Sequence, residues 1–183
     1  MTAILKVDTI QDTAGNNIIN DNANTITIGK SGDTINLASG ATAGFGKILQ
    51  VVNATDSTAR STTSTSFVTA SNTLSVSITP SSTSSKIFLI ANSNGYANNA
   101  GLNAYFTIYR GATNLGNASN GMINWWDETN RQIGNGWSIT YLDSPATTSA
   151  TTYQVYMKVD SGTTAFMNYN TTLGSITAFE VGA

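Results

Sequence analysis

The sequence predicts an all-β protein. Thr, which favours pleated strands, and Ser, Asn and Gly, which favour turns, are abundant throughout. Short segments in which apolar and polar residues alternate recur at regular spacing, and no segment has a helical period. With 40% apolar residues the 183-residue chain can build a core, so the composition does not indicate disorder. We expect a β-sandwich or jelly roll preceded by a thin appendage.

The appendage begins with residues 1–23, which contain one alternating stretch at 4–10 and a turn at 13–17. We interpret residues 1–23 as a segment that anchors the chain to something larger. Residues 24–46 follow and contain two copies of a short Thr/Ile unit, 25–29 and 34–38, offset by nine positions (34 − 25).

A unit this thin has one apolar face and no second layer to cover it. Such units gain a core by stacking on neighbours, and one chain holds too few copies to stack on itself. We therefore expect residues 24–46 to form an intertwined β stalk with other copies of the chain. Phe45 lies between two glycines and would plug the junction to the large domain. The residues expected to hold the stalk together are Ile26, Ile28, Ile35, Leu37 and Phe45.

The large domain, residues 47–183, contains about ten candidate strands. They are expected at 47–52, 67–68, 74–78, 86–91, 104–110, 114–115, 122–126, 137–142, 152–158, 164–169 and 175–181. The continuous apolar run 86–91 is expected to be central, and 53–66 to be a surface loop. We expect two hairpins, one joining 104–110 to 114–115 and one joining 152–158 to 164–169.

Composition excludes several kinds of site. The net charge is −2 without a Lys/Arg cluster, so there is no electrostatic footprint for nucleic acid. The absence of Cys and His excludes disulfides, thiolate metal sites and the usual catalytic triads, and no acidic residues have calcium-loop spacing. We expect neither a metal nor a cofactor. No signal peptide or membrane-length apolar run is present, so we expect synthesis in a cytoplasm and no membrane insertion.

Catalysis is not expected. A glycosidase requires two carboxylates across a cleft, but the close pair here, Asp127 and Glu128, is adjacent in sequence. Neighbouring side chains on a strand point to opposite faces, and in a loop the pair fits a solvated turn.

Two stretches are candidates for binding, either of a receptor or of another subunit. The first contains Trp125 and Trp126 beside Asp127 and Arg131. One indole should lie in the core and the other outside, because neighbouring residues face opposite sides of a strand. Aromatic rings flanked by Asn, Asp and Arg suit sugar rings as well as protein interfaces. The second is an expected loop at 92–99, whose candidates are Asn94 and Tyr96.

Several motifs resemble those of short tail-fibre proteins of aquatic, and especially marine, bacteriophages. The similarity covers essentially the whole chain. The motifs are LKVDTIQDTAGN (5–16), NTITIGKSGDTINLASGAT (24–42), SITPSSTSSKI (77–87), YRGATNLG (109–116), YLDSPATTSA (141–150) and SITAFEV (175–181).

The resemblance implies a homotrimer in the virion tail that binds a host surface glycan or protein. Residues 1–23 would attach to other tail or capsid proteins, 24–46 would form the stalk and 47–183 the knob. The knob also resembles tumour-necrosis-factor-like jelly rolls at the level of fold. Two alternatives remain open: a trimeric capsid decoration protein that stabilises the phage head, and a polysaccharide depolymerase, which the missing carboxylate cleft disfavours.

Overall fold

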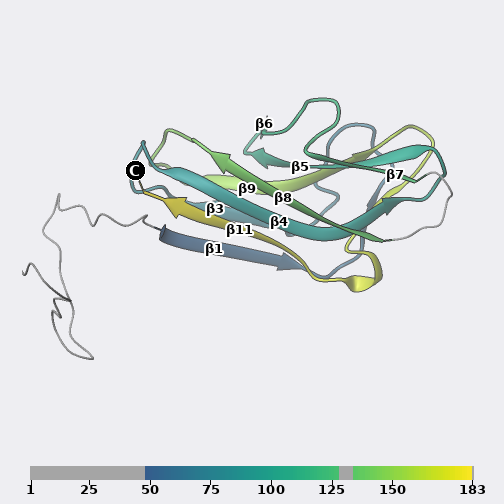
Figure 1. Cartoon of the computed structure of the whole chain (residues 1–183), viewed down its shortest axis with the longest axis horizontal. Coiled ribbons are helices and arrows are strands. Elements are labelled where there is room, and N and C mark those ends of the chain that lie inside the picture. The colour runs from purple at the N-terminus through teal and green to yellow at the C-terminus, as the bar shows by residue number, and fades with distance from the viewer. Residues whose placement is uncertain (1–47, 128–133, 183) are drawn as a thin grey trace, which may run out of the picture. The chain divides into compact units, whose positions relative to one another are not determined.

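The computed structural model describes residues 48–127 and 134–182, which all belong to the unit formed by residues 45–183. In this part of the chain the strands are accompanied by one short 3₁₀ helix (Figure 1). The elements are β1 (Ile48–Asp56), β2 (Arg60–Thr62), β3 (Ser75–Ile78), β4 (Lys86–Ala97), β5 (Leu102–Arg110), β6 (Thr113–Asn114), β7 (Ile123–Asp127), β8 (Asn135–Asp143), β9 (Thr151–Val159), β10 (Ala165–Met167), η1 (Tyr169–Thr171) and β11 (Gly174–Val181). Outside the described residues lie the predicted segment 1–23, the stalk residues Ile26, Ile28, Ile35, Leu37 and Phe45, and Arg131.

The first sheet is antiparallel and is organised around β4. One edge of β4 pairs with β8, and the other edge pairs first with β11 and then with β10. β1 pairs with β11, and β2 pairs with β10. β1 and β2 therefore act as one interrupted edge strand, and β10 and β11 as one interrupted inner strand. The prediction of a central strand beginning at Lys86 is confirmed.

The second sheet is also antiparallel and has the order β3–β9–β5. The far edge of β5 pairs with β6 and β7, one after the other. If each interrupted strand is counted once, residues 48–127 and 134–182 supply eight strands, four to each sheet. Numbered along the chain, the two sheets have the orders 1-8-3-6 and 2-7-4-5. Most connections pass from one sheet to the other, which is the arrangement of a jelly roll. The predicted all-β sandwich is confirmed.

Alternate residues of the two sheets meet in the core. Phe106 of β5 is fully buried and stacks on Trp137 of β8 in the opposite sheet, with ring centroids 4.9 Å apart. Leu89 of β4 and Ile176 of β11 are also fully buried. Burying a side chain of this size stabilises the fold by roughly 1.5–3 kcal/mol, so the interface between the sheets is the main source of stability.

The sandwich has two ends along its long axis (Figure 1). At the proximal end, β1 begins with Ile48, which pairs with Val181 near the end of β11, and Val181 in turn pairs with Lys86 at the start of β4. At the distal end, β4 and β7 terminate and β5 and β8 begin. The connections 98–101 and 160–164 lie at this distal end. The chain before Ile48 therefore joins the domain at the proximal end.

Three local predictions are wrong. The expected surface loop 53–66 contains the end of β1 and all of β2, because Ser and Thr occupy outward positions of these strands. The expected loop 92–99 is mostly strand, since β4 continues to Ala97 with small inward residues. Strands β9 and β10 do not form a hairpin, because β9 pairs with β5 and β10 pairs with β4 in the other sheet. The hairpin of β5 and β6 is confirmed.

Candidate binding site

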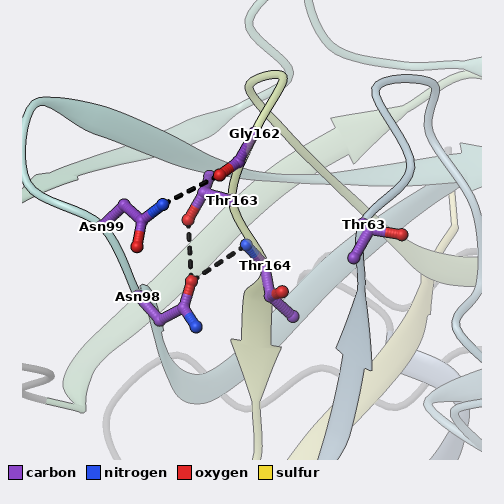
Figure 2. A pocket seen from close by; sticks show the side chains of 6 residues that line it. All are labelled: Thr63, Asn98, Asn99, Gly162, Thr163 and Thr164. Carbon is purple, nitrogen blue, oxygen red and sulfur yellow. Dashed lines mark hydrogen bonds between the residues drawn. The ribbon is translucent and has the colours of Figure 1, made fainter.

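A polar recess of about 310 Å³ lies at the distal end (Figure 2). The loop after β4 forms one side of it and the loop before β10 another, and Thr63, just after β2, completes the lining. The lining residues are Thr63, Asn98, Asn99, Gly162, Thr163 and Thr164. The recess is therefore assembled by three segments that are distant in sequence.

Asn98 holds the two loops together. Its side-chain Oδ1 accepts hydrogen bonds from Thr163 Oγ1 at 2.8 Å and from the Thr164 backbone N–H at 3.1 Å. The Asn98 backbone N–H donates to the Thr164 carbonyl over 3.1 Å, and Asn99 Nδ2 donates to the Gly162 carbonyl over 2.8 Å. Within residues 48–127 and 134–182, Asn98 Nδ2 and Asn99 Oδ1 have no hydrogen-bond partner. One amide donor and one amide acceptor thus remain for a ligand.

The recess carries neutral hydrogen-bonding groups: amides, hydroxyls and backbone groups. Gly162 has a φ of 87°, and no atom of the described residues lies within 4 Å of the place where a Cβ would be. Groups of this kind are suited to a neutral, hydroxyl-rich ligand, because each ligand hydroxyl can donate to one group and accept from another.

The two tryptophans of β7 face opposite sides, as predicted. Trp125 pairs with Ala104 and packs against the core, whereas Trp126 pairs with Asn103 and is 56% exposed. Trp126 thus presents an indole to solvent at the distal end of the second sheet. The backbone of Asp127 ends β7 opposite Leu102.

Asn103, the neighbour of Trp126, is held in place by Asp160. The carboxylate accepts from the Asn103 backbone N–H and from Asn103 Nδ2, both at 2.8 Å, and from the Tyr105 hydroxyl at 3.0 Å. Burial alone would raise the pKa of Asp160, but these hydrogen bonds and the charge of Lys158 lower it below its ordinary value. The Lys158 ammonium lies 4.6 Å from the centre of the Tyr105 ring. Asp160 therefore supports the surface around Trp126 as a fixed anion.

Asn94 and Tyr96 do not lie on a loop, because both belong to β4. Tyr96 is buried, stacks on Phe166 with centroids 4.8 Å apart and meets the edge of Tyr169 at 4.9 Å. Asn94 Nδ2 donates to the Tyr169 carbonyl over 3.2 Å and to Thr172 Oγ1 over 3.1 Å. The two residues come together around η1, where they support the distal surface from below.

Sequence reasoning missed most of the recess. The predicted binding stretch 92–99 contains Asn98 and Asn99 at its end, but it contains neither Thr63 nor residues 162–164. The available signal was the Asp160-Ser161-Gly162 turn, which closes a strand. The connection that contains this turn lies beside Asn98 because β9 and β10 belong to different sheets, which the sequence does not show.

The carboxylates whose side chains the structure describes each have hydrogen-bond partners. Asp56 binds Arg60, Asp143 binds Arg110 and Tyr153, and Glu180 binds Gln50 and Ser81. No group of three acidic residues that could hold a metal ion occurs in the described part of the chain. Within residues 48–127 and 134–182 there is also no helix long and apolar enough to cross a membrane.

No protein-family model and no curated protein sequence matches this chain. Among solved structures, it is similar to a mutant VP2 protein of infectious bursal disease virus in T=1 particles, with 14% identity over 82% of this chain and a TM-score of 0.40. It is also similar to the VP2 subviral particle of the same virus, with 14% identity over 82% of this chain and a TM-score of 0.37. The chain spans only 41% and 42% of these two VP2 chains. Similarities of this size carry no information on function.

Proposed function

We propose that the chain is a non-enzymatic phage attachment protein, a tail-fibre subunit whose distal end binds carbohydrate on the host cell surface. The observation that carries this proposal is the separation of the two ends. The preceding chain joins at Ile48, at the proximal end, whereas Trp126 and the recess around Asn98 lie at the distal end. A protein anchored through its N-terminal part would present the distal end outward.

The chemistry of the distal end supports a glycan rather than a charged ligand. Among the described residues, the recess offers an unpaired amide donor on Asn98 and an unpaired amide acceptor on Asn99, together with threonine hydroxyls. The exposed Trp126 ring can stack on the CH face of a sugar while hydroxyls bond to nearby amides. The carboxylates with described side chains are engaged in structural hydrogen bonds, which favours binding over hydrolysis.

Binding of the full chain to purified capsular polysaccharide and lipopolysaccharide from candidate host bacteria tests the proposal. We expect Trp126→Ala and Asn98→Ala each to weaken binding at least about tenfold, a loss of about 1.4 kcal/mol. The control is Thr148→Ala, an exposed position at the proximal end. Equal affinity of all four proteins would contradict the proposed site, and release of oligosaccharide would instead indicate a depolymerase.

The tail location, the homotrimer, the anchoring role of 1–23 and the stalk at 24–46 are parts of the same proposal, and they rest on the sequence. Gold-labelled antibody on intact virions tests the location. Label on the tail supports a fibre, whereas label over the whole head indicates a decoration protein.

A further inference from the structure

A row of four apolar side chains crosses the outward face of the first sheet near the proximal end. Register places one member on each of the four strands, and adjacent members pair directly. The rings of Phe88 and Phe179 lie in the middle of the row, with centroids 6.2 Å apart. The row consists, in spatial order, of Val51 (β1), Phe179 (β11), Phe88 (β4) and Leu142 (β8).

The two ends of this row are open to solvent. Val51 is 54% exposed and Leu142 is 52% exposed. Six large apolar side chains are exposed in the described part of the chain, and four of them lie on β1 or β8 around the row: Ile48, Leu49, Val51 and Leu142. We call Ile48, Val51, Phe88, Leu142, Phe179 and Val181 the outer patch. Exposed apolar groups that gather in this way mark an interaction surface.

The face that carries the outer patch is almost free of charge. Outward positions alternate with buried ones along β1, β4, β8 and β11, and they hold Ser, Thr, Asn and apolar residues. Among these described outward positions Lys86 is the one charged side chain, and it lies at the rim, where Nζ donates to Ser144 Oγ over 2.9 Å. A face with almost no charge can pack against an apolar or neutral face of another copy without burying unpaired charges, whereas it offers a charged partner nothing to recognise.

The chain that precedes the described domain reaches it at this patch. Residue 47 is joined to Ile48, a member of the patch, and the Thr/Ile repeat at 24–46 is predicted from the sequence to gather copies of the chain. Copies gathered there would have the starts of their β1 strands close together. β1 is moreover an edge strand, and an uncovered edge carrying Ile48, Leu49 and Val51 would invite uncontrolled association.

We propose that the outer patch is a contact surface between copies of this chain. A second copy covers the row from Val51 to Leu142 and leaves the distal end free. This assignment rests on the proposed gathering of copies by residues 24–46, but it does not depend on what the distal end binds.

The absence of cysteine makes a clean cross-linking test possible in the full chain. Val51→Cys and Leu142→Cys place one thiol in the patch, and Trp126→Cys places one at a similarly exposed site at the other end. At low micromolar concentration, a short bifunctional maleimide should convert the two patch variants into covalent dimers. The Trp126→Cys control should remain at its monomer mass of 19.1 kDa under denaturing conditions.

A charged side chain introduced into the outer patch should weaken the contact between copies at this surface. Leu142→Glu, combined with Val51→Cys, is expected to lower the cross-linked fraction about tenfold or more, because it would bury an unpaired carboxylate in an apolar contact. Leu142 is exposed, so the domain should fold with the substitution, and an unchanged melting temperature verifies this. The proposal is overturned if the three single-cysteine variants cross-link equally, or if light scattering finds the wild-type full chain to be a monomer.

Discussion

Tyr153 on β9 donates a hydrogen bond from its hydroxyl to Asp143 Oδ2 on β8 over 2.6 Å, and this contact links the two sheets inside the sandwich. Arg110 Nη1 on β5 lies 2.9 Å from both oxygens of the same carboxylate. Tyr153 is fully buried and Asp143 nearly so. One buried anion thus satisfies two donors of the opposite sheet.

Tyr153→Phe removes one donor and keeps the ring. We expect a loss of roughly 1.5–3 kcal/mol in the free energy of unfolding, the range for a hydrogen bond to a charged group. Urea unfolding at neutral pH measures it. Tyr156→Phe is the control, since Tyr156 lies on the outward face of the same strand. Equal losses in the two variants would contradict a special role for Tyr153.

The raised pKa of Tyr153 leads to a prediction of how the stability of the fold changes at alkaline pH. Burial raises the pKa of its hydroxyl, and the hydrogen bond to Asp143 raises it further. The folded state therefore keeps a proton that the unfolded state loses above a pH of about 10. Stability should fall as the pH rises beyond 10, and it should fall less steeply in Tyr153→Phe.

The lowered pKa of Glu180 leads to a prediction of how the stability of the fold changes at acidic pH. Burial alone would raise its pKa, but hydrogen bonds from Ser81 and Gln50 lower the pKa from 4.5 to about 2. The stabilisation is therefore present above pH 4.5 and is lost as the pH falls towards 2.

Glu180→Gln keeps the shape but cannot accept from all these donors, so we expect a loss of roughly 1–3 kcal/mol at neutral pH. The difference in stability between wild type and variant should narrow from pH 4.5 to pH 2. Other carboxylates titrate in both proteins and cancel in this comparison. A difference that stays constant with pH would show that Glu180 does not titrate as described.

Gly95 is required by a close approach across the core. A Cβ at this position would lie 2.6 Å from the Phe106 ring and 2.6 Å from the Phe166 carbonyl oxygen. Gly95→Ala should therefore destabilise the domain by about 1–3 kcal/mol through overpacking. At Gly136, in the adjacent strand, an added Cβ would meet, among the described residues, only the Ser93 carbonyl oxygen, at 4.0 Å. Gly136→Ala should therefore be neutral or slightly stabilising. Thermal unfolding of both variants measures the contrast.

Substitution of the two adjacent tryptophans should have different effects on stability, because Trp125 packs on the core whereas Trp126 is exposed. Trp125→Ala removes a ring that packs on the core and should cost about 2 kcal/mol or more. Trp126→Ala removes an exposed ring and should change stability by no more than about 0.5 kcal/mol. Calorimetry on the two variants checks this, and a large loss of stability in Trp126→Ala would assign that indole to packing rather than to ligand contact.

Most strands could be predicted from the sequence, because a strand with one buried face has a period of two. Ser75–Ile78, Thr151–Val159 and Gly174–Val181 all show this period, and the structure has strands there. The same rule correctly predicted that Trp125 and Trp126 lie on opposite faces of their strand. It failed in the second half of β4, where the inward positions are filled by small residues such as Gly95 and Ala97 and carry no apolar signal.

The sequence by itself determined the all-β class, the opposite orientations of the two tryptophans and the absence of cysteine chemistry, because these depend on residue type and local alternation alone. Only the tertiary structure decided which sheet each strand joins. Alternation shows which face of a strand is buried but not the strand beside it, since partners are chosen by packing across the whole sandwich. Three features depend on that choice and could not be predicted from the sequence alone: the recess at Asn98, the contact of Tyr153 with Asp143, and the row from Val51 to Leu142.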